Sequence, residues 1–160
     1  MTQPDALAAA LALLPRPWVF TNGVFDLLHR GHVTYLERAR DQGTSLIVAV
    51  NSDASVRRLG KGADRPINVC DDRIAVLAAL ASTSLVTWFD QDTPLALIQM
   101  LRPDVLVKGG DWPVAAIVGN EFVHGYGGRV LSIPFEFERS TSATLSAIRA
   151  GKSAEGTGPS

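Results

Sequence analysis

Five short apolar runs recur along the chain, and most of them are apolar throughout instead of alternating with polar residues. They are rich in Val, Ile and Leu, and each is shorter than a typical helix. Strands that are covered on both faces, as in a parallel sheet, have this composition. The runs predict strands at residues 18–22, 46–51, 85–89, 105–108 and 129–133.

The segments between these runs have helical periodicity. In 71–81, apolar residues recur at the i, i+3, i+4, i+7 spacing of one helix face. Further along, Thr93 can cap a helix whose apolar stripe is Leu95, Ile98 and Leu101. Strand and helix alternate about five times, which predicts a single doubly wound α/β domain with a parallel sheet of about five strands.

We divide the chain into three parts: an N-terminal helix at 1–16, the α/β domain at 17–150, and a flexible tail at 151–160. The first part is apolar but lacks a basic start, so we interpret it as an amphipathic helix and not as a signal peptide. The last part is small and polar, which is typical of a mobile chain end.

Net charge, the length of the apolar runs and the cysteine count exclude several classes of function. The formal net charge is −1 at pH 7, so no basic surface indicates nucleic acid or an acidic membrane as a partner. No apolar run reaches the roughly 18 residues of a membrane span. The only cysteine, Cys70, excludes a disulfide within the chain and a zinc site built from cysteines. We therefore expect a cytoplasmic protein.

Two of the three histidines, His29 and His32, flank Gly31 where the first predicted strand gives way to a helix. Ligands of doubly wound sheets bind at the carboxyl ends of the strands. The N-terminus of a helix attracts phosphate, and both imidazoles can donate hydrogen bonds. Gly23 and Gly31 let the backbone approach a ligand closely. The segment indicates an anion site, although a capped helix with histidines bonded to carbonyl groups explains the spacing equally well.

Other loops at the same predicted edge carry donors. Lys108 follows an apolar strand and precedes two glycines, so we expect it beside a ligand. Arg139 comes just before three hydroxyl residues at a predicted helix start, where hydroxyls also serve as ordinary caps. These three residues are Ser140, Thr141 and Ser142.

Charged residues around the long loop after the second predicted strand have two interpretations. Basic residues lie in and after this loop: Arg57, Arg58, Lys61, Arg65 and Arg73. They form a solvated surface or contact a polyphosphate. Asp26 and Asp53 could orient a ribose, a lysine or hydrated Mg²⁺, or could simply form turns, and Asn51 is a further candidate for orienting a substrate. Trp112, His124 and Cys70 receive no assigned role.

Two common nucleotide-binding motifs are absent. No G-x-G-x-x-G follows the first predicted strand, and no G-x-x-x-x-G-K-[ST] occurs. The sequence therefore supports neither the usual dinucleotide-binding fold nor a P-loop protein.

Four segments, in this order, resemble a known family: FTNGVFDLLHRGHVTYLERAR, LIVAVNSDASVRRLGKGADRPIN, RPDVLVKGGDW and RSTSATL. The first contains the H-x-G-H signature of the cytidylyltransferase-like nucleotidylyltransferases. The four together look most like the branch that adenylates heptose 1-phosphate, and the likeness runs from about residue 18 to 149. It implies a Rossmann-like domain that joins a nucleoside triphosphate to a phosphorylated small molecule and releases pyrophosphate.

The resemblance implies roles for particular residues. His29, His32 and Lys108 would be catalytic, with both histidines contacting the triphosphate. Nucleotide and phosphate contacts would come from Thr21, Asn22, Gly23, Val24, Phe25, Gly31, Gly110, Asp111, Glu121, Arg139, Ser140, Thr141 and Ser142. Ser142 stands where the family often has threonine, and Trp112 stands where tyrosine is common.

The resemblance also implies ATP with Mg²⁺, heptose 1-phosphate as the acceptor, a product for the inner core of lipopolysaccharide, and a homodimer. Two alternatives stay open. One is cytidylyl or guanylyl transfer to another sugar or polyol phosphate, because phosphate-binding groups would look the same. The other is a nucleotide-binding regulator without catalysis.

Overall fold

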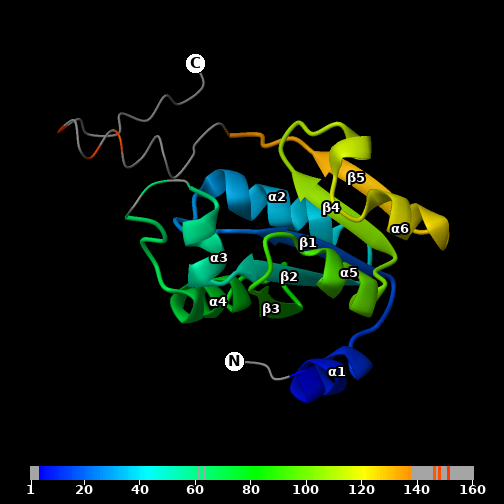
Figure 1. Ribbon diagram of the computed structural model, residues 1–160. Coiled ribbons are helices and arrows are strands. Elements are labelled where there is room, and N and C mark those ends of the chain that lie inside the picture. The colour runs from blue at the N-terminus through cyan, green and yellow to red at the C-terminus, as the bar shows by residue number, and fades with distance from the viewer. Residues whose placement is uncertain are drawn as a thin grey trace.

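A parallel sheet forms the centre of the protein (Figure 1). The computed structural model describes residues 4–60, 62, 64–137, 146, 148 and 151. The five strands lie in the order β3-β2-β1-β4-β5, and every neighbouring pair is parallel. They are β1 (Trp18–Gly23), β2 (Ser45–Asn51), β3 (Leu85–Phe89), β4 (Val105–Gly109) and β5 (Arg129–Ile133). The predicted doubly wound α/β fold is therefore confirmed.

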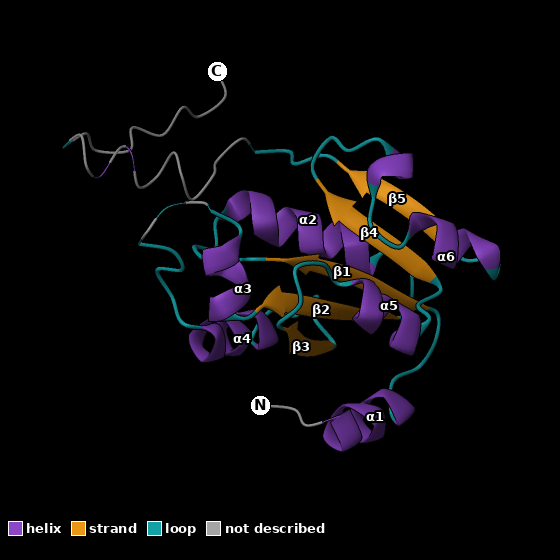
Figure 2. Ribbon diagram, in the orientation of Figure 1, coloured by secondary structure: helices purple, strands orange, loops and turns teal. Residues whose placement is uncertain are grey.

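Helices cover both faces of this sheet (Figure 2). They are α1 (Pro4–Ala12), α2 (Arg30–Arg40), α3 (Asp53–Arg58), α4 (Cys70–Ala78), α5 (Leu95–Leu101) and α6 (Asn120–Gly125), with a short 3-10 helix, η1 (Val114–Ala116). Buried side chains of α2 and α4 belong to one core cluster, and those of α1, α5 and α6 belong to the other. The crossovers that follow β1 and β2 thus lie on one face, and those that follow β3 and β4 lie on the other.

The apolar composition of the strands follows from this double cover. All seven residues of β2 are buried, because β2 has a strand on each side and a helix layer on each face. Along β1, Val19 belongs to the first core cluster and Phe20 to the second, as the alternation of a strand requires. Strand β1 is the central strand, so its carboxyl end lies between those of β2 and β4.

The structure differs from the prediction in the short helices. Helices α3 and α6 were not expected, since each has only six residues and no long apolar stripe. In α5 the predicted cap is wrong: the residue before the helix is Pro94, and no side chain caps it. Leu95 is 37% exposed, while Leu97 is buried, because α5 turns Leu97, Ile98 and Leu101 toward the sheet.

The three-part division stays a prediction. Helix α1 packs on the sheet through Leu7, which belongs to the same core cluster as α5. Residues 152–160 of the predicted tail lie outside the described residues. Among the helices that the structure describes, none has the length and apolar character needed to cross a bilayer.

Candidate active site

The polar residues that end the central strands lie on one face of the sheet. Asn22, Asn51 and Lys108 each follow by two positions a residue of the second core cluster. Because side chains two apart in a strand share a face, all three side chains lie on the side of α5 and α6. The Lys108 ammonium donates to the Asn22 carbonyl oxygen at 3.3 Å, which ties β4 to the end of β1.

A cavity of about 310 Å³ opens at this edge. Its lining comes from the ends of all four strands β1 to β4 and from the loops after them. The lining residues that carry polar side chains or an indole are Asn22, Asn51, Asp92, Thr93, Lys108 and Trp112. Asp92 and Thr93 were not among the predicted site residues. They lie in the loop after β3, so the rule that ligands bind at carboxyl ends would have included them.

The two histidines lie together at the start of α2. His29 is the residue before the helix, with extended backbone, and its carbonyl oxygen accepts from the His32 N–H at 2.9 Å. The two imidazole rings lie 3.9 Å apart between centroids and are tilted by 31°. Phe25, the aromatic neighbour of His32, belongs to the core cluster on the α2 face. The histidines and the cavity therefore lie on opposite sides of the end of β1.

Aromatic rings surround His32. Phe25 and Phe135 approach it edge-on, with centroid distances of 5.5 and 5.9 Å. Burial, and secondarily the charge of His29, lower the pKa of His32 to about 4. At neutral pH the His32 imidazole is therefore uncharged and can donate one hydrogen bond, and an anion bound nearby would raise its pKa.

Gly31 is needed for a reason that the sequence did not reveal. A Cβ atom at this position would lie 2.7 Å from the Phe137 carbonyl oxygen and 3.1 Å from the His29 ring. The guanidinium of Arg30 also stacks on the Phe137 ring at 3.7 Å. The chain that leaves β5 thus crosses directly over the start of α2. The predicted phosphate-binding residues that follow it lie outside the described residues: Arg139, Ser140, Thr141 and Ser142.

Thr21, a predicted nucleotide contact, directs its side chain into the core. Its hydroxyl lies 2.5 Å from the Tyr35 hydroxyl, and both residues are buried. Burial raises the pKa of the Tyr35 phenol well above its ordinary value. Thr21 can therefore meet a nucleotide only through its backbone. Tyr35 was missed, although its place three residues after His32 puts both on the same side of α2.

Asp26, Arg65 and Arg73 are buried, and the charge of each is paired with that of another side chain. The Arg65 guanidinium lies 2.5 Å from the Asp26 carboxylate, and the Arg73 guanidinium lies 2.8 Å from that of Asp53. The structure thus places these four predicted orienting residues in internal ion pairs, and Lys61 lies outside the described residues. Among the residues described, no three His, Cys, Asp or Glu side chains are grouped so that they could hold a metal ion.

The loop after β4 is held by Ser132. The Ser132 hydroxyl donates to the Gly110 carbonyl at 2.6 Å and accepts from the Trp112 N–H at 3.0 Å. Gly110 has a φ of +111°, which favours glycine. The Trp112 indole is 51% exposed and lines the cavity. Asp111, Glu121 and His124 are exposed and do not line it.

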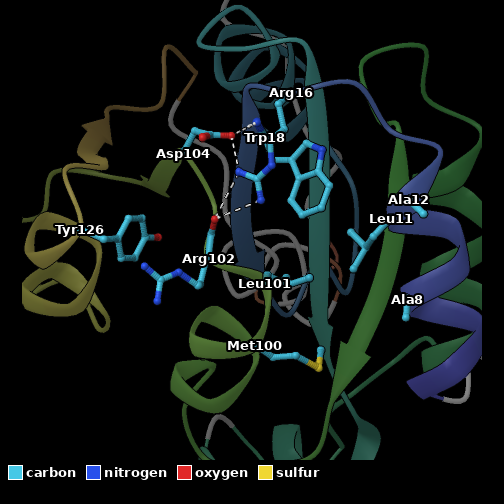
Figure 3. Close-up of a pocket in the computed structure, with 10 residues that line it drawn as sticks. All are labelled: Ala8, Leu11, Ala12, Arg16, Trp18, Met100, Leu101, Arg102, Asp104 and Tyr126. Carbon is cyan, nitrogen blue, oxygen red and sulfur yellow. Dashed lines mark hydrogen bonds and ion pairs between the residues drawn. The ribbon is translucent and has the colours of Figure 1, made fainter.

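A larger cavity, of about 590 Å³, lies at the opposite edge of the sheet (Figure 3). Ala8 and Leu11 of α1 face it from one side and Met100 of α5 from another, and Arg102 stacks on Tyr126 at its margin. None of the predicted site residues lines this cavity.

A doubly wound parallel sheet that has polar strand ends and paired histidines at its carboxyl edge is an α/β domain of the type that binds its ligand at this edge. The chain belongs to the cytidylyltransferase-like family, whose model matches residues 20–138. This confirms the resemblance that the four sequence segments indicated.

Individual relatives agree with the family. The chain is 58% identical to the D-beta-D-heptose 1-phosphate adenylyltransferase of Bordetella bronchiseptica, over 90% of this chain and 89% of that protein. It is 53% identical to the bifunctional protein HldE of Hahella chejuensis over 82% of this chain, but it spans only 27% of HldE. Among solved structures, the lipopolysaccharide core biosynthesis protein of Thermoplasma volcanium superposes with a TM-score of 0.61 at 25% identity, covering 76% of this chain and 98% of that one.

Proposed function

We propose that this chain transfers the adenylyl group of ATP to D-glycero-β-D-manno-heptose 1-phosphate, giving ADP-heptose and pyrophosphate. The observation that carries the proposal is the 58% identity, across nearly the whole of both chains, to the adenylyltransferase of Bordetella bronchiseptica. The paired histidines at the start of α2 and the polar cavity beyond the strands support it, because they supply donors on both sides of the end of β1.

The transfer forms one P–O bond and breaks another. A phosphate oxygen of heptose 1-phosphate attacks the α-phosphorus of ATP, and the bond from this phosphorus to the oxygen that bridges to the β-phosphate breaks. The attacking phosphate is already anionic, so no general base is needed. The protein has to hold two anions together and to stabilise the charge that moves onto pyrophosphate.

His29 and His32 suit the second task. Stacking of the two rings and the aromatic contacts of His32 fix their positions before any ligand arrives. Donors that are fixed in this way, in a partly buried site, stabilise developing charge more than mobile donors in water do. We assign to both histidines the donation of hydrogen bonds to the triphosphate as pyrophosphate leaves.

The cavity suits the acceptor. Asn22, Asn51 and Asp92 offer hydrogen-bonding groups to sugar hydroxyls, and the indole of Trp112 offers an apolar face. Lys108 lies in the same lining and also contacts the end of β1. In this arrangement its ammonium binds phosphate where acceptor and nucleotide meet.

We also propose that Mg²⁺ accompanies ATP and offsets the charge of its phosphates. Asp26 does not fit as a ligand, since its carboxylate is buried and already accepts the Ile67 and Asn68 N–H groups and pairs with Arg65. Phosphate oxygens and water are ligands that Mg²⁺ commonly keeps. We further propose that the protein acts in the cytoplasm as a homodimer, and a monomer mass from light scattering would contradict the dimer.

The test is pyrophosphate release by the purified chain with ATP and heptose 1-phosphate, with the product mass measured in parallel. CTP, GTP and glycerol 3-phosphate are offered in separate reactions. ADP-heptose formed from ATP in preference to the other triphosphates supports the proposal. Turnover with CTP and glycerol phosphate alone would show a cytidylyltransferase, and nucleotide binding without any turnover would show a regulator.

A further inference from the structure

A group of buried charges lies behind the loop that joins β1 to α2. The side chains of Asp26 and Arg73 are fully buried, and that of Arg65 is 6% exposed. Burying a charge is costly unless it is paired and fully hydrogen-bonded, so such a group needs an explanation. The proposed transfer does not use these side chains, because each is occupied inside the protein.

Arg73 connects three segments of the chain. Its guanidinium donates to the carbonyl oxygens of Val24 at 2.7 Å and Asn68 at 3.0 Å. A third contact, at 2.8 Å, is the ion pair with Asp53 at the start of α3. A guanidinium presents its donors in a fixed planar arrangement, so one side chain sets the relative positions of all three acceptors.

Asp26 holds the same loop from its other end. Its carboxylate accepts the N–H groups of Ile67 at 2.9 Å and Asn68 at 2.8 Å, and it pairs with Arg65. The side-chain amide of Asn68 in turn donates to the backbone carbonyl oxygen of Asp26 at 2.6 Å. The residues on both sides of Phe25 are therefore held, Val24 by Arg73 of α4 and Asp26 by the segment that precedes α4.

The residue between these two attachment points has an unusual backbone. Phe25 has a φ of +49°, in the left-handed region that bulky residues seldom adopt. Such a conformation persists only where the surrounding structure imposes it, and it is frequent at functional sites. Here the contacts of Val24 and Asp26 impose it.

The left-handed conformation decides where the Phe25 ring lies. The ring is buried and meets the His32 imidazole edge-on, with centroids 5.5 Å apart and planes at 65°. The Nδ1 atom of His32 is buried and has no hydrogen-bond partner among the described residues. The orientation of His32 on this side thus depends on ring packing.

We propose that Arg73 and Asp26 are positioning residues: they hold Phe25 in its left-handed conformation, and the Phe25 ring thereby orients the His32 imidazole. In consequence α4 and the segment before it control a histidine that they do not touch. The link to catalysis rests on the proposed function, whereas the link to His32 geometry does not.

The first experiment reads His32 directly and needs no substrate. With only three histidines in the chain, the imidazole NMR signals can be assigned by substituting each in turn. Arg73→Lys keeps the charge but cannot reach all three acceptors, and we expect it to shift the His32 signals in the folded protein. Arg16→Gln is the matched control, because it breaks an ion pair with Asp104 at the opposite edge. It should leave the His32 signals unchanged.

A double-mutant cycle tests the route through the ring. Phe25→Leu keeps an apolar side chain but removes the ring, and it should shift the His32 signals by itself. If Arg73 acts through that ring, then Arg73→Lys adds little further shift in the Phe25→Leu background. Equal shifts in both backgrounds would overturn the proposal, and so would a His32 signal that stays unchanged in Arg73→Lys while the melting temperature falls. If Arg73→Lys fails to fold, Asp26→Asn carries the same test.

Kinetics form the second experiment. Displacement of a positioned group by about 1 Å can cost on the order of 100-fold in rate, so we expect Arg73→Lys to lower kcat about 10- to 100-fold. KM for ATP should change much less. A change confined to KM would overturn the positioning role. Absence of adenylyl transfer in the wild-type protein would refute the proposed function, while the NMR result would still decide the inference.

Discussion

The two edges of the sheet each hold a cavity, and the larger one lies away from every predicted site residue. At the amino edge, polar groups are used to hold the fold: Arg16 pairs with Asp104 at 2.8 Å and stacks on Trp18 at 3.8 Å. At the carboxyl edge lie histidine side chains at the start of α2 and, on the other side of the end of β1, lysine and asparagine side chains that line the cavity. The larger cavity is thus lined by groups that hold the fold, whereas the smaller one has predicted site residues in its lining.

Chain direction explains the difference. In a doubly wound sheet, the helix after each strand starts near the carboxyl edge, so backbone N–H groups and a partial positive charge gather there. The amino edge receives the carbonyl ends of the helices. Arg102, which follows α5, fits this edge, since cations favour the carbonyl end of a helix. Phosphorylated ligands should therefore bind at the carboxyl edge.

The largest expected effect is at the histidines. His29→Ala and His32→Ala should each lower kcat by about 100- to 1,000-fold, or about 3–4 kcal/mol, because each removes a fixed donor to developing charge. The measurement is pyrophosphate release, with circular dichroism to show that each variant is folded. Near-wild-type turnover in either folded variant would remove that histidine from the site.

Lys108 should have the next largest effect. Lys108→Met keeps most of the apolar stem but removes the charge, and a lost charged hydrogen bond costs about 1.5–3 kcal/mol. We expect KM for the phosphorylated substrates to rise about 10- to 100-fold, with a smaller change in kcat. Titration calorimetry with ATP and with heptose 1-phosphate checks which ligand is affected. Unchanged binding of both would return Lys108 to a structural role.

A pH effect on stability should come from His32. Its pKa is lowered to about 4 in the folded protein, from 6.5 in the unfolded chain. Between these values the unfolded state binds more protons, so the free energy of unfolding contributed by His32 decreases as pH falls from about 6.5 to 4. Urea denaturation across this range should show a flatter pH dependence for His32→Gln than for the wild type. Identical slopes would show that His32 is not protected from protonation.

The smallest effect should come from the amino edge. Arg16→Gln breaks a half-exposed ion pair and an aromatic contact, so the free energy of unfolding should fall by about 1 kcal/mol. Turnover should stay within about twofold of wild type, since the proposed active site lies at the other edge. A large loss of turnover would show that the two edges are coupled, and it would contradict a purely structural role for the amino edge.

The strands were predictable because their signal is local. Residues 85–89 and 129–133 match β3 and β5 in full, and the other strands differ by one residue at an end. The placement of His29, His32 and Lys108 at the carboxyl edge was also predictable, because each lies at or after the end of a predicted strand in the sequence. The six-residue helices could not be predicted, because one or two turns contain too little periodicity.

The buried ion pairs were not predictable from sequence. Asp26 and Arg73 look like ordinary loop and helix charges, but each makes a contact with a segment about 40 to 50 positions away, such as that of Arg73 with Val24. Only the folded chain shows that the two side chains face inward. The same holds for Gly31, where an added Cβ atom would lie 2.7 Å from the carbonyl oxygen of Phe137.

The contact between Gly31 and Phe137 also has a consequence for biosynthesis. The H-x-G-H segment and β1 leave the ribosome before β4, so β1 has to wait for β4 before both its neighbours are in place. Phe137 emerges later still, after β5. We expect the start of α2 to stay open to solvent until the end of the domain has been synthesised, so that the site made first along the chain is completed last.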